Sequence, residues 1–102
     1  DTIEKFSARL DTLKAEAEKI DRDPTTIDLA FWAVWFGGDT PTMLESGERM
    51  VLTGSAEHIA GDIKAFEALG VRHVLFNFLG ATLEDSLANM EGFAADVMPL
   101  VR

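Results

Sequence analysis

The chain has no cysteine among its 102 residues, which excludes disulfides, thiolate metal sites and a cysteine nucleophile. A cysteine-free chain is compatible with a reducing cytoplasm, where we expect this protein to act. Long apolar runs are also missing, because the longest, residues 29–36, is much too short to cross a bilayer. The chain opens at Asp1, without a methionine or a pattern typical of a signal peptide, so we expect a piece of a longer protein.

Basic residues are scarce, with 9 Lys and Arg against 18 Asp and Glu, and the formal net charge is −9. Phosphate contacts need clustered Lys or Arg, so we expect neither nucleic acid nor an anionic membrane as a partner. Acidic side chains that solubilise helix surfaces explain the charge as well. The apolar fraction of 47% is ordinary for a globular protein, and the length allows one small domain.

The first 20 residues carry apolar side chains at helical spacing, which predicts an amphipathic helix that ends at the turn 21–24. A coiled coil shows the same spacing, but the stripe covers fewer than three heptads and lacks consistent e/g pairing. The predicted stripe is Ile3, Phe6, Leu10, Leu13, Ala17 and Ile20.

Residues 27–36 are apolar on both faces apart from Asp28 and end at two glycines, which favours a strand over a helix. A long loop, residues 39–52, precedes a second helix, which Thr53 or Ser55 caps. Ile59, Ile63 and Phe66 are the predicted buried stripe of this helix, and Gly70 is its predicted left-handed cap.

A second strand is predicted over residues 73–79, and Thr82 then caps a closing helix. The predicted buried stripe of that helix is Leu83, Leu87, Met90, Ala94, Val97 and Val101, supported by Phe93. The element order is therefore α-β-α-β-α, and strands joined by helical crossovers pair in parallel. The sequence predicts the α/β class.

Two parallel strands leave a hydrogen-bonding edge open on each side, and each unpaired, half-buried backbone group costs about 1–3 kcal/mol. Since total domain stability is only about 5–15 kcal/mol, we expect these strands to have neighbours that the chain does not supply. Either further polypeptide or further copies of the chain would provide them. A small sandwich with undetected strands is the third possibility.

Alternation places His73, Leu75, Asn77 and Leu79 on one face of the second strand and the larger apolar residues on the other. Asn77 lies toward the carboxyl end of its strand, where parallel α/β folds bind ligands. A purely structural hydrogen bond from Asn77 to neighbouring backbone is the competing interpretation.

The stretch from Met50 to Arg102 resembles the C-terminal end of luciferase-like flavin-dependent oxidoreductases. The matching motifs, in order, are Gly54-Ser55-Ala56-Glu57, Leu69-Gly70-Val71, the strand 74–78 and Val97-Met98-Pro99. The resemblance implies a TIM (β/α)8 barrel, of which residues 1–102 would be a single partial domain that contributes the last two strands. It also implies FMN or coenzyme F420 as cofactor and a small-molecule substrate for the parent enzyme.

Within that resemblance, the barrel rule for phosphate sites makes Asn77, Gly80 and Arg49 the cofactor-side candidates, with Trp35 a candidate neighbour of the isoalloxazine ring. Because most of the barrel is absent, we expect the 102-residue piece alone to be inactive. We expect it to associate with the missing N-terminal part or to form a homo-oligomer.

A non-catalytic α/β module that self-associates through strand edges or helix faces is the alternative function. His58 and His73 lack the spacing of metal ligands, and no metal site is predicted. Asp62, Glu84 and Asp85 are predicted to be ordinary solvated acids on helices.

Overall fold

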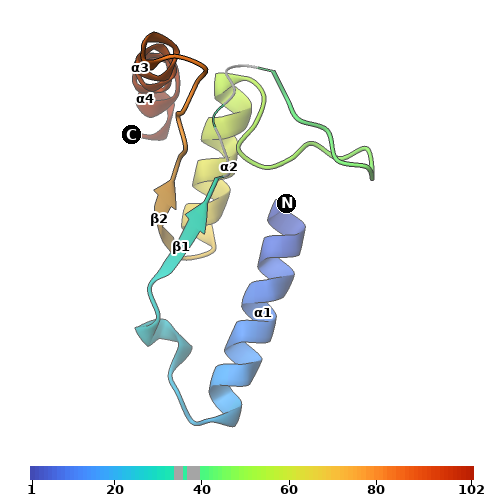
Figure 1. Cartoon of the computed structure of the whole chain (residues 1–102). Helices are drawn as coiled ribbons and strands as arrows, with labels where there is room; N and C mark the ends of the chain where they lie inside the picture. Colours follow the sequence, from blue (N-terminus) through green and yellow to red (C-terminus); the bar gives the residue numbers. More distant parts are fainter. Residues whose placement is uncertain (34–35, 37–39) are drawn as a thin grey trace.

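A computed structural model describes residues 1–33, 36 and 40–102 of the chain. The fold is α/β, with the predicted alternation of helices and strands and one parallel two-stranded sheet (Figure 1). Its elements are α1 (Ile3–Lys19), the 3-10 turn η1 (Pro24–Thr26), β1 (Leu29–Trp32), α2 (Ala56–Ala68), β2 (Val71–Leu75), α3 (Leu83–Gly92), the π-turn η2 (Phe93–Val97) and α4 (Met98–Val101).

Both strands differ from the predicted ranges. β1 spans four residues and β2 begins two residues earlier than expected and ends at Leu75. Hydrogen bonds continue the ladder beyond these ends, from the Ala33 N–H to the Leu75 carbonyl (2.8 Å) and from the Phe36 N–H to the Asn77 carbonyl (2.7 Å). The predicted strand 27–36 includes residues 34 and 35, which lie outside the described residues.

The predicted helix ends are confirmed where a local side chain or a glycine fixes them. Ser55 caps α2 by accepting a hydrogen bond from the His58 N–H, and Thr82 caps α3 by accepting one from Asp85. Gly70 follows α2 with a φ of 93°, which a residue with a Cβ rarely adopts. Thr53 is not a cap, because its hydroxyl is bound within the loop before α2.

The seven phenylalanines form two clusters on one side of the sheet. The first aromatic cluster is Phe6 of α1, Phe31 of β1 and Phe66 of α2, with ring centroids 4.5–5.5 Å apart. Phe66 is fully buried, and Phe31 is in register with Val74 of β2, which packs against the same core. This cluster therefore fixes α1 and α2 to the same face of the sheet.

The second aromatic cluster lies toward the carboxyl ends of the strands and comprises Phe36, Phe76, Phe78 and Phe93. Phe93 of η2 contacts the other three rings, with centroid separations from 4.6 to 5.6 Å. Phe76 and Phe78 continue the alternation of Val74, so the closing helix also packs on the side of α1 and α2.

The opposite side of the sheet, here named the bare face, has no described helix over it. Trp32 and Leu75 are paired in register there, with 72% and 54% of their surface exposed, and Leu79 is 77% exposed. The remaining residues of the bare face are Ala30, His73 and Asn77, all exposed. The predicted division of the second strand into two faces is confirmed, and one face is left open to solvent.

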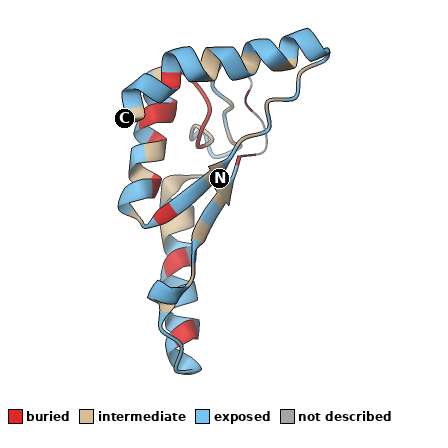
Figure 2. Cartoon of the chain, turned by 90° about the vertical axis from the view of Figure 1, so that its left-hand side faces the viewer, coloured by how far each residue is buried: buried red, intermediate tan, exposed pale blue. Residues whose placement is uncertain are grey.

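The predicted stripe of the last helix is wrong over α3. Leu83 is 75% exposed, Leu87 and Met90 are about half exposed, and in Figure 2 α3 is mostly pale blue with tan bands and no red. The buried part of the prediction begins after α3, at Val97, which is 2% exposed. Helical spacing identified an apolar stripe correctly but could not show whether a neighbour covers it.

The molecule is elongated, with extents of 49 × 29 × 24 Å and a radius of gyration of 15.3 Å. A compact domain of about 100 residues has a radius of gyration near 13 Å. Figures 1 and 2 show the reason, since α1 points away from the helical stretch of α3 and α4, which crosses the opposite end of the sheet.

Candidate functional site

Asn77 takes part in the last hydrogen bond between the two strand segments that the described residues show. Its main-chain carbonyl accepts the Phe36 N–H, and its side-chain Oδ1 accepts the N–H of Leu79 at 3.0 Å. An asparagine that binds the backbone two residues later makes a local turn and interrupts a strand. Asn77 Oδ1 therefore makes the structural hydrogen bond to neighbouring backbone that was the competing prediction. Its Nδ2 has no hydrogen-bond partner among the described residues.

Gly80 allows the segment after β2 to approach the first turn of α3. Its N–H donates to the Ser86 hydroxyl at 2.9 Å. An added Cβ at Gly80 would lie 2.6 Å from the Asp85 Cβ and 3.2 Å from the backbone, so a larger residue would force the two segments apart. The sequence prediction placed Gly80 near a cofactor, and the geometry gives it a steric role.

Arg49 is engaged inside the molecule. Its Nη1 and Nη2 donate to the two carboxylate oxygens of Asp62 at 2.8 and 2.9 Å, and Nη1 also donates to the Thr53 carbonyl at 2.6 Å. Hydrogen bonding to Asp62 raises the pKa of Arg49 above its ordinary value. The guanidinium holds residues 42–53 against α2, and its charge is already paired with the Asp62 carboxylate.

The sequence prediction for Asp62 is wrong. This residue was predicted to be a solvated acid, but it is 7% exposed and carries the ion pair with Arg49. Its position between Ile59 and Phe66 on α2 placed an acid on a buried stripe, and that conflict was the available signal. A carboxylate on such a stripe requires a partner.

Asp62 also stabilises a strained residue. Leu52 has a φ of 62° and is 1% exposed, and its N–H donates to Asp62 Oδ2 at 2.8 Å. A left-handed backbone costs a residue with a Cβ about 1–2 kcal/mol, so the surrounding contacts must offset that strain. Asp62 thus joins the loop to α2 through both Arg49 and Leu52.

The loop that these bonds hold is a small hairpin, residues 42–50, which projects from the body of the molecule (Figure 1). Met43 and Arg49 form an antiparallel bridge, the Met50 N–H donates to the Thr42 carbonyl at 2.7 Å, and Gly47 turns with a φ of 84°. The predicted long loop is therefore ordered over its described part. Its base is fixed by buried polar groups.

The remaining candidate, Trp35, lies outside the described residues. Asn77 and Gly80 belong to the segment after β2, and no hydrogen bond among the described residues joins either of them to Arg49.

No catalytic constellation is visible in the described ranges. The hydroxyls of Ser55 and Ser86 accept hydrogen bonds from backbone N–H groups, and His58 and His73 are exposed. The described residues contain no group of three potential metal ligands. None of the described helices combines the length and apolar character needed to cross a membrane.

Comparisons with known proteins give no assignment: no family model, no curated protein and no solved structure matches the chain.

Proposed function

We propose that the chain is the C-terminal part of a luciferase-like oxidoreductase of the cytoplasm, in which it forms the last two strands of a (β/α)8 barrel. The proposal combines the sequence resemblance with the way that the helices and the sheet are arranged. On this view the chain is a structural sector of an enzyme and is inactive by itself.

The bare face is the observation that carries the proposal. In a (β/α)8 barrel the helices surround the strands and the inner face of the sheet contacts only other strands. In a doubly wound sheet, helices cover both faces. Here α1, α2 and η2 all pack on one face, and Trp32 and Leu75 on the other face are largely exposed.

The distribution of charge also supports an apolar neighbour for the bare face. No acidic residue occurs in 29–33 or 71–80, although 18 of the 102 residues are acidic. Each large apolar side chain gains about 1.5–3 kcal/mol when it leaves water, so covering Trp32, Leu75 and Leu79 would be strongly favourable. The inward-facing side chains of the other barrel strands would cover them.

The contribution of this chain to cofactor binding is small on the described geometry. Arg49 donates its hydrogen bonds to Asp62 and Thr53, and the Gly80 N–H is bound to Ser86. These groups do not form a phosphate site, so the parent enzyme would hold FMN or F420 mainly through other parts of the barrel. The cofactor, when bound, would supply the redox chemistry, and the Asn77 Nδ2 group, which has no hydrogen-bond partner among the described residues, would offer it a donor.

The test is a titration of the longer polypeptide that this proposal requires with FMN and, separately, with F420, followed by absorbance and flavin fluorescence. We expect saturable binding of one cofactor and none by the 102-residue chain. Absence of binding to both cofactors at high concentration would remove the proposal. Asn77→Ala should weaken binding, whereas Glu91→Gln, on an exposed position of α3, should not.

A second candidate is self-association without catalysis, which the same exposed side chains favour. An exposed apolar patch with two open strand edges is a site at which copies of a chain pair. Sedimentation equilibrium of the 102-residue chain separates the candidates when it is repeated with the longer polypeptide. A defined oligomer of the short chain, together with a longer polypeptide that binds no cofactor, would favour this candidate.

A further inference from the structure

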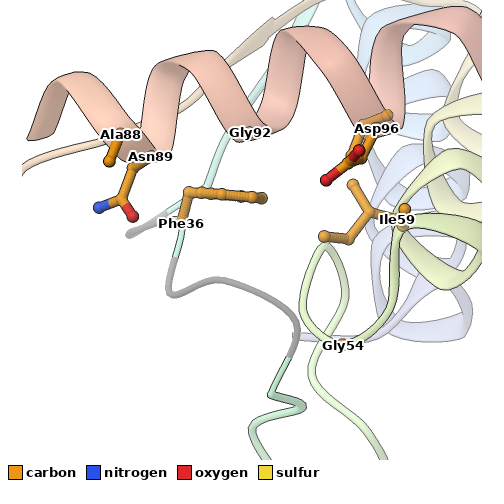
Figure 3. Close-up of a pocket in the computed structure, with 9 residues that line it drawn as sticks. Phe36, Gly54, Ile59, Ala88, Asn89, Gly92 and Asp96 are labelled. Carbon is orange, nitrogen blue, oxygen red and sulfur yellow. The ribbon is translucent and has the colours of Figure 1, made fainter. Parts of the chain in front are cut away.

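A cavity of about 240 Å³ lies beneath the closing helix (Figure 3). It is on the opposite side of the sheet from the bare face, because the core residues Phe36, Ile59 and Val97 line it. Its apolar wall consists of Phe36, Ile59 and Val97, which are 8%, 1% and 2% exposed. These side chains come from three segments that the core already fixes. The cavity is therefore a built feature of the fold, and none of the cofactor candidates Asn77, Gly80 and Arg49 lines it.

Four of the residues that line the cavity are small: Gly54, Ala56, Ala88 and Gly92. At Gly92 an added Cβ would meet no atom within 4 Å, and the backbone is helical, with a φ of −60°. Glycine inside a helix is less stable than alanine by about 1 kcal/mol. Neither backbone conformation nor crowding requires glycine at this position, where it lines the cavity.

The side-chain groups at the two ends of the cavity are hydrogen-bond acceptors. Asn89 donates its Nδ2 to the Phe78 carbonyl at 3.1 Å, which leaves Oδ1 available as an acceptor. At the other end, the Asp96 carboxylate has no hydrogen bond or ion pair with the described residues and points toward Ile59 and the Phe36 ring (Figure 3). No Lys or Arg occurs between residues 73 and 101, and Arg102 at the end of the closing segment forms no ion pair with Asp96.

The π-turn η2 contributes both Asp96 and Val97 to the cavity. The Met98 N–H donates to the Phe93 carbonyl five residues earlier, which is the wide turn of a π-helix. Such turns occur mostly as single insertions within α-helices and are frequent at functional sites. This one brings an acid and a core valine to the same opening.

The geometry points to a binding site for a small organic cation with a flat apolar body, such as a primary aromatic amine. The ring lies against Phe36, Ile59 and Val97, the ammonium group pairs with Asp96, and an N–H can reach Asn89 Oδ1. The volume equals that of about eight water molecules, which suits a ligand of about that many non-hydrogen atoms. For so small a ligand in an open site, we expect a Kd of about 1 mM.

The experiment is an NMR titration of the 15N-labelled chain with three ligands that share one ring: 2-phenylethylamine, 2-phenylethanol and phenylacetate. We expect the amine to shift the amide signals of Gly54, Asn89 and Gly92, with an affinity at least tenfold above that of phenylacetate and the alcohol between them. No shift with the amine, or equal shifts with phenylacetate, would overturn the proposal.

Two variants locate the site. Gly92→Leu fills the cavity and should abolish binding, whereas Gly61→Leu is a matched control on α2, where an added Cβ also meets nothing within 4 Å. Asp96→Asn should remove the preference for the amine over the alcohol and keep binding of the alcohol. Equal effects of the two leucine variants, or an unchanged preference in Asp96→Asn, would contradict the assignment. Since Asp96 is exposed, its variant gives a result even if Gly92→Leu fails to fold.

Discussion

The two aromatic clusters show how differently the two halves of this molecule are held. The first cluster joins two helices to β1 around Phe66, which has no exposed surface. The second joins one helical turn to the strand ends, and three of its four rings are only partly buried. Phe6 and Phe31 of the first cluster are partly buried too, so the clusters differ in their central ring: Phe66 has no exposed surface, whereas Phe93 is only partly buried. The α3 half is held by Phe93 and Val97 of η2 and by the polar contacts of α3.

The polar contacts of α3 explain why its leucine stripe is exposed. Ser86 binds the Gly80 N–H and Asn89 binds the Phe78 carbonyl, so the side of α3 that faces the body is the one with Ser86, Asn89 and Phe93. The stripe that begins at Leu83 is turned away from it. Hydrogen bonds to a loop have set the rotation of this helix, and its most apolar side has no described neighbour.

The substitution with the largest expected effect on stability tests whether the first aromatic cluster is the main core. Phe66→Ala should lower the free energy of unfolding by about 4 kcal/mol, because it removes a fully buried ring that two others contact. Phe93→Ala, in the partly buried second cluster, should cost clearly less. Urea denaturation followed by circular dichroism measures both, and equal losses would break the comparison.

Asp62→Ala should have the second largest effect and lower the free energy of unfolding by about 3 kcal/mol. The substitution leaves Arg49 and the Leu52 N–H without their carboxylate partner. Glu67→Ala, on the exposed side of the same helix, is the matched control and should change stability by less than about 0.5 kcal/mol. The hairpin 42–50 should also become sensitive to limited proteolysis. A variant that unfolds no more easily than the control would show that the ion pair does not hold the loop.

Asn89→Ala examines the polar attachment of α3 and should cost about 1 kcal/mol, since one hydrogen bond to the Phe78 carbonyl is lost. Hydrogen exchange should accelerate in α3 and remain slow in α2, because the first cluster is untouched. Glu91→Ala is the control on the same helix. Faster exchange throughout the chain would instead indicate one cooperative unit.

Leu83→Ser should have the smallest effect, within about 0.5 kcal/mol, because this leucine is largely exposed. Ile59→Ala in the buried stripe of α2 should cost about 2–5 kcal/mol by the same denaturation measurement. If the chain self-associates through α3, Leu83→Ser should also weaken the oligomer in sedimentation experiments. A loss like that of Ile59→Ala would mean that Leu83 is buried in solution.

The sequence predicted those features that depend on residues close together in the chain, such as helix caps. Ser55, Thr82 and Gly70 fix helix ends through their own backbone or a residue three positions away, so their roles followed from the sequence. The pairing of Arg49 with Asp62 did not, because the partners are thirteen residues apart and meet only after the loop folds back. The exposed stripe of α3 was missed for a related reason, since periodicity describes one helix and not its neighbours.

The left-handed backbone of Leu52 has a consequence for the order of folding events. A leucine in an isolated peptide avoids this conformation, and the acceptor for its N–H is a carboxylate that lies on α2, ten residues further along the chain. The segment before α2 can thus reach its final shape only after that helix has formed. The hairpin that projects from this segment would be the last part of the chain to fold and the first to unfold.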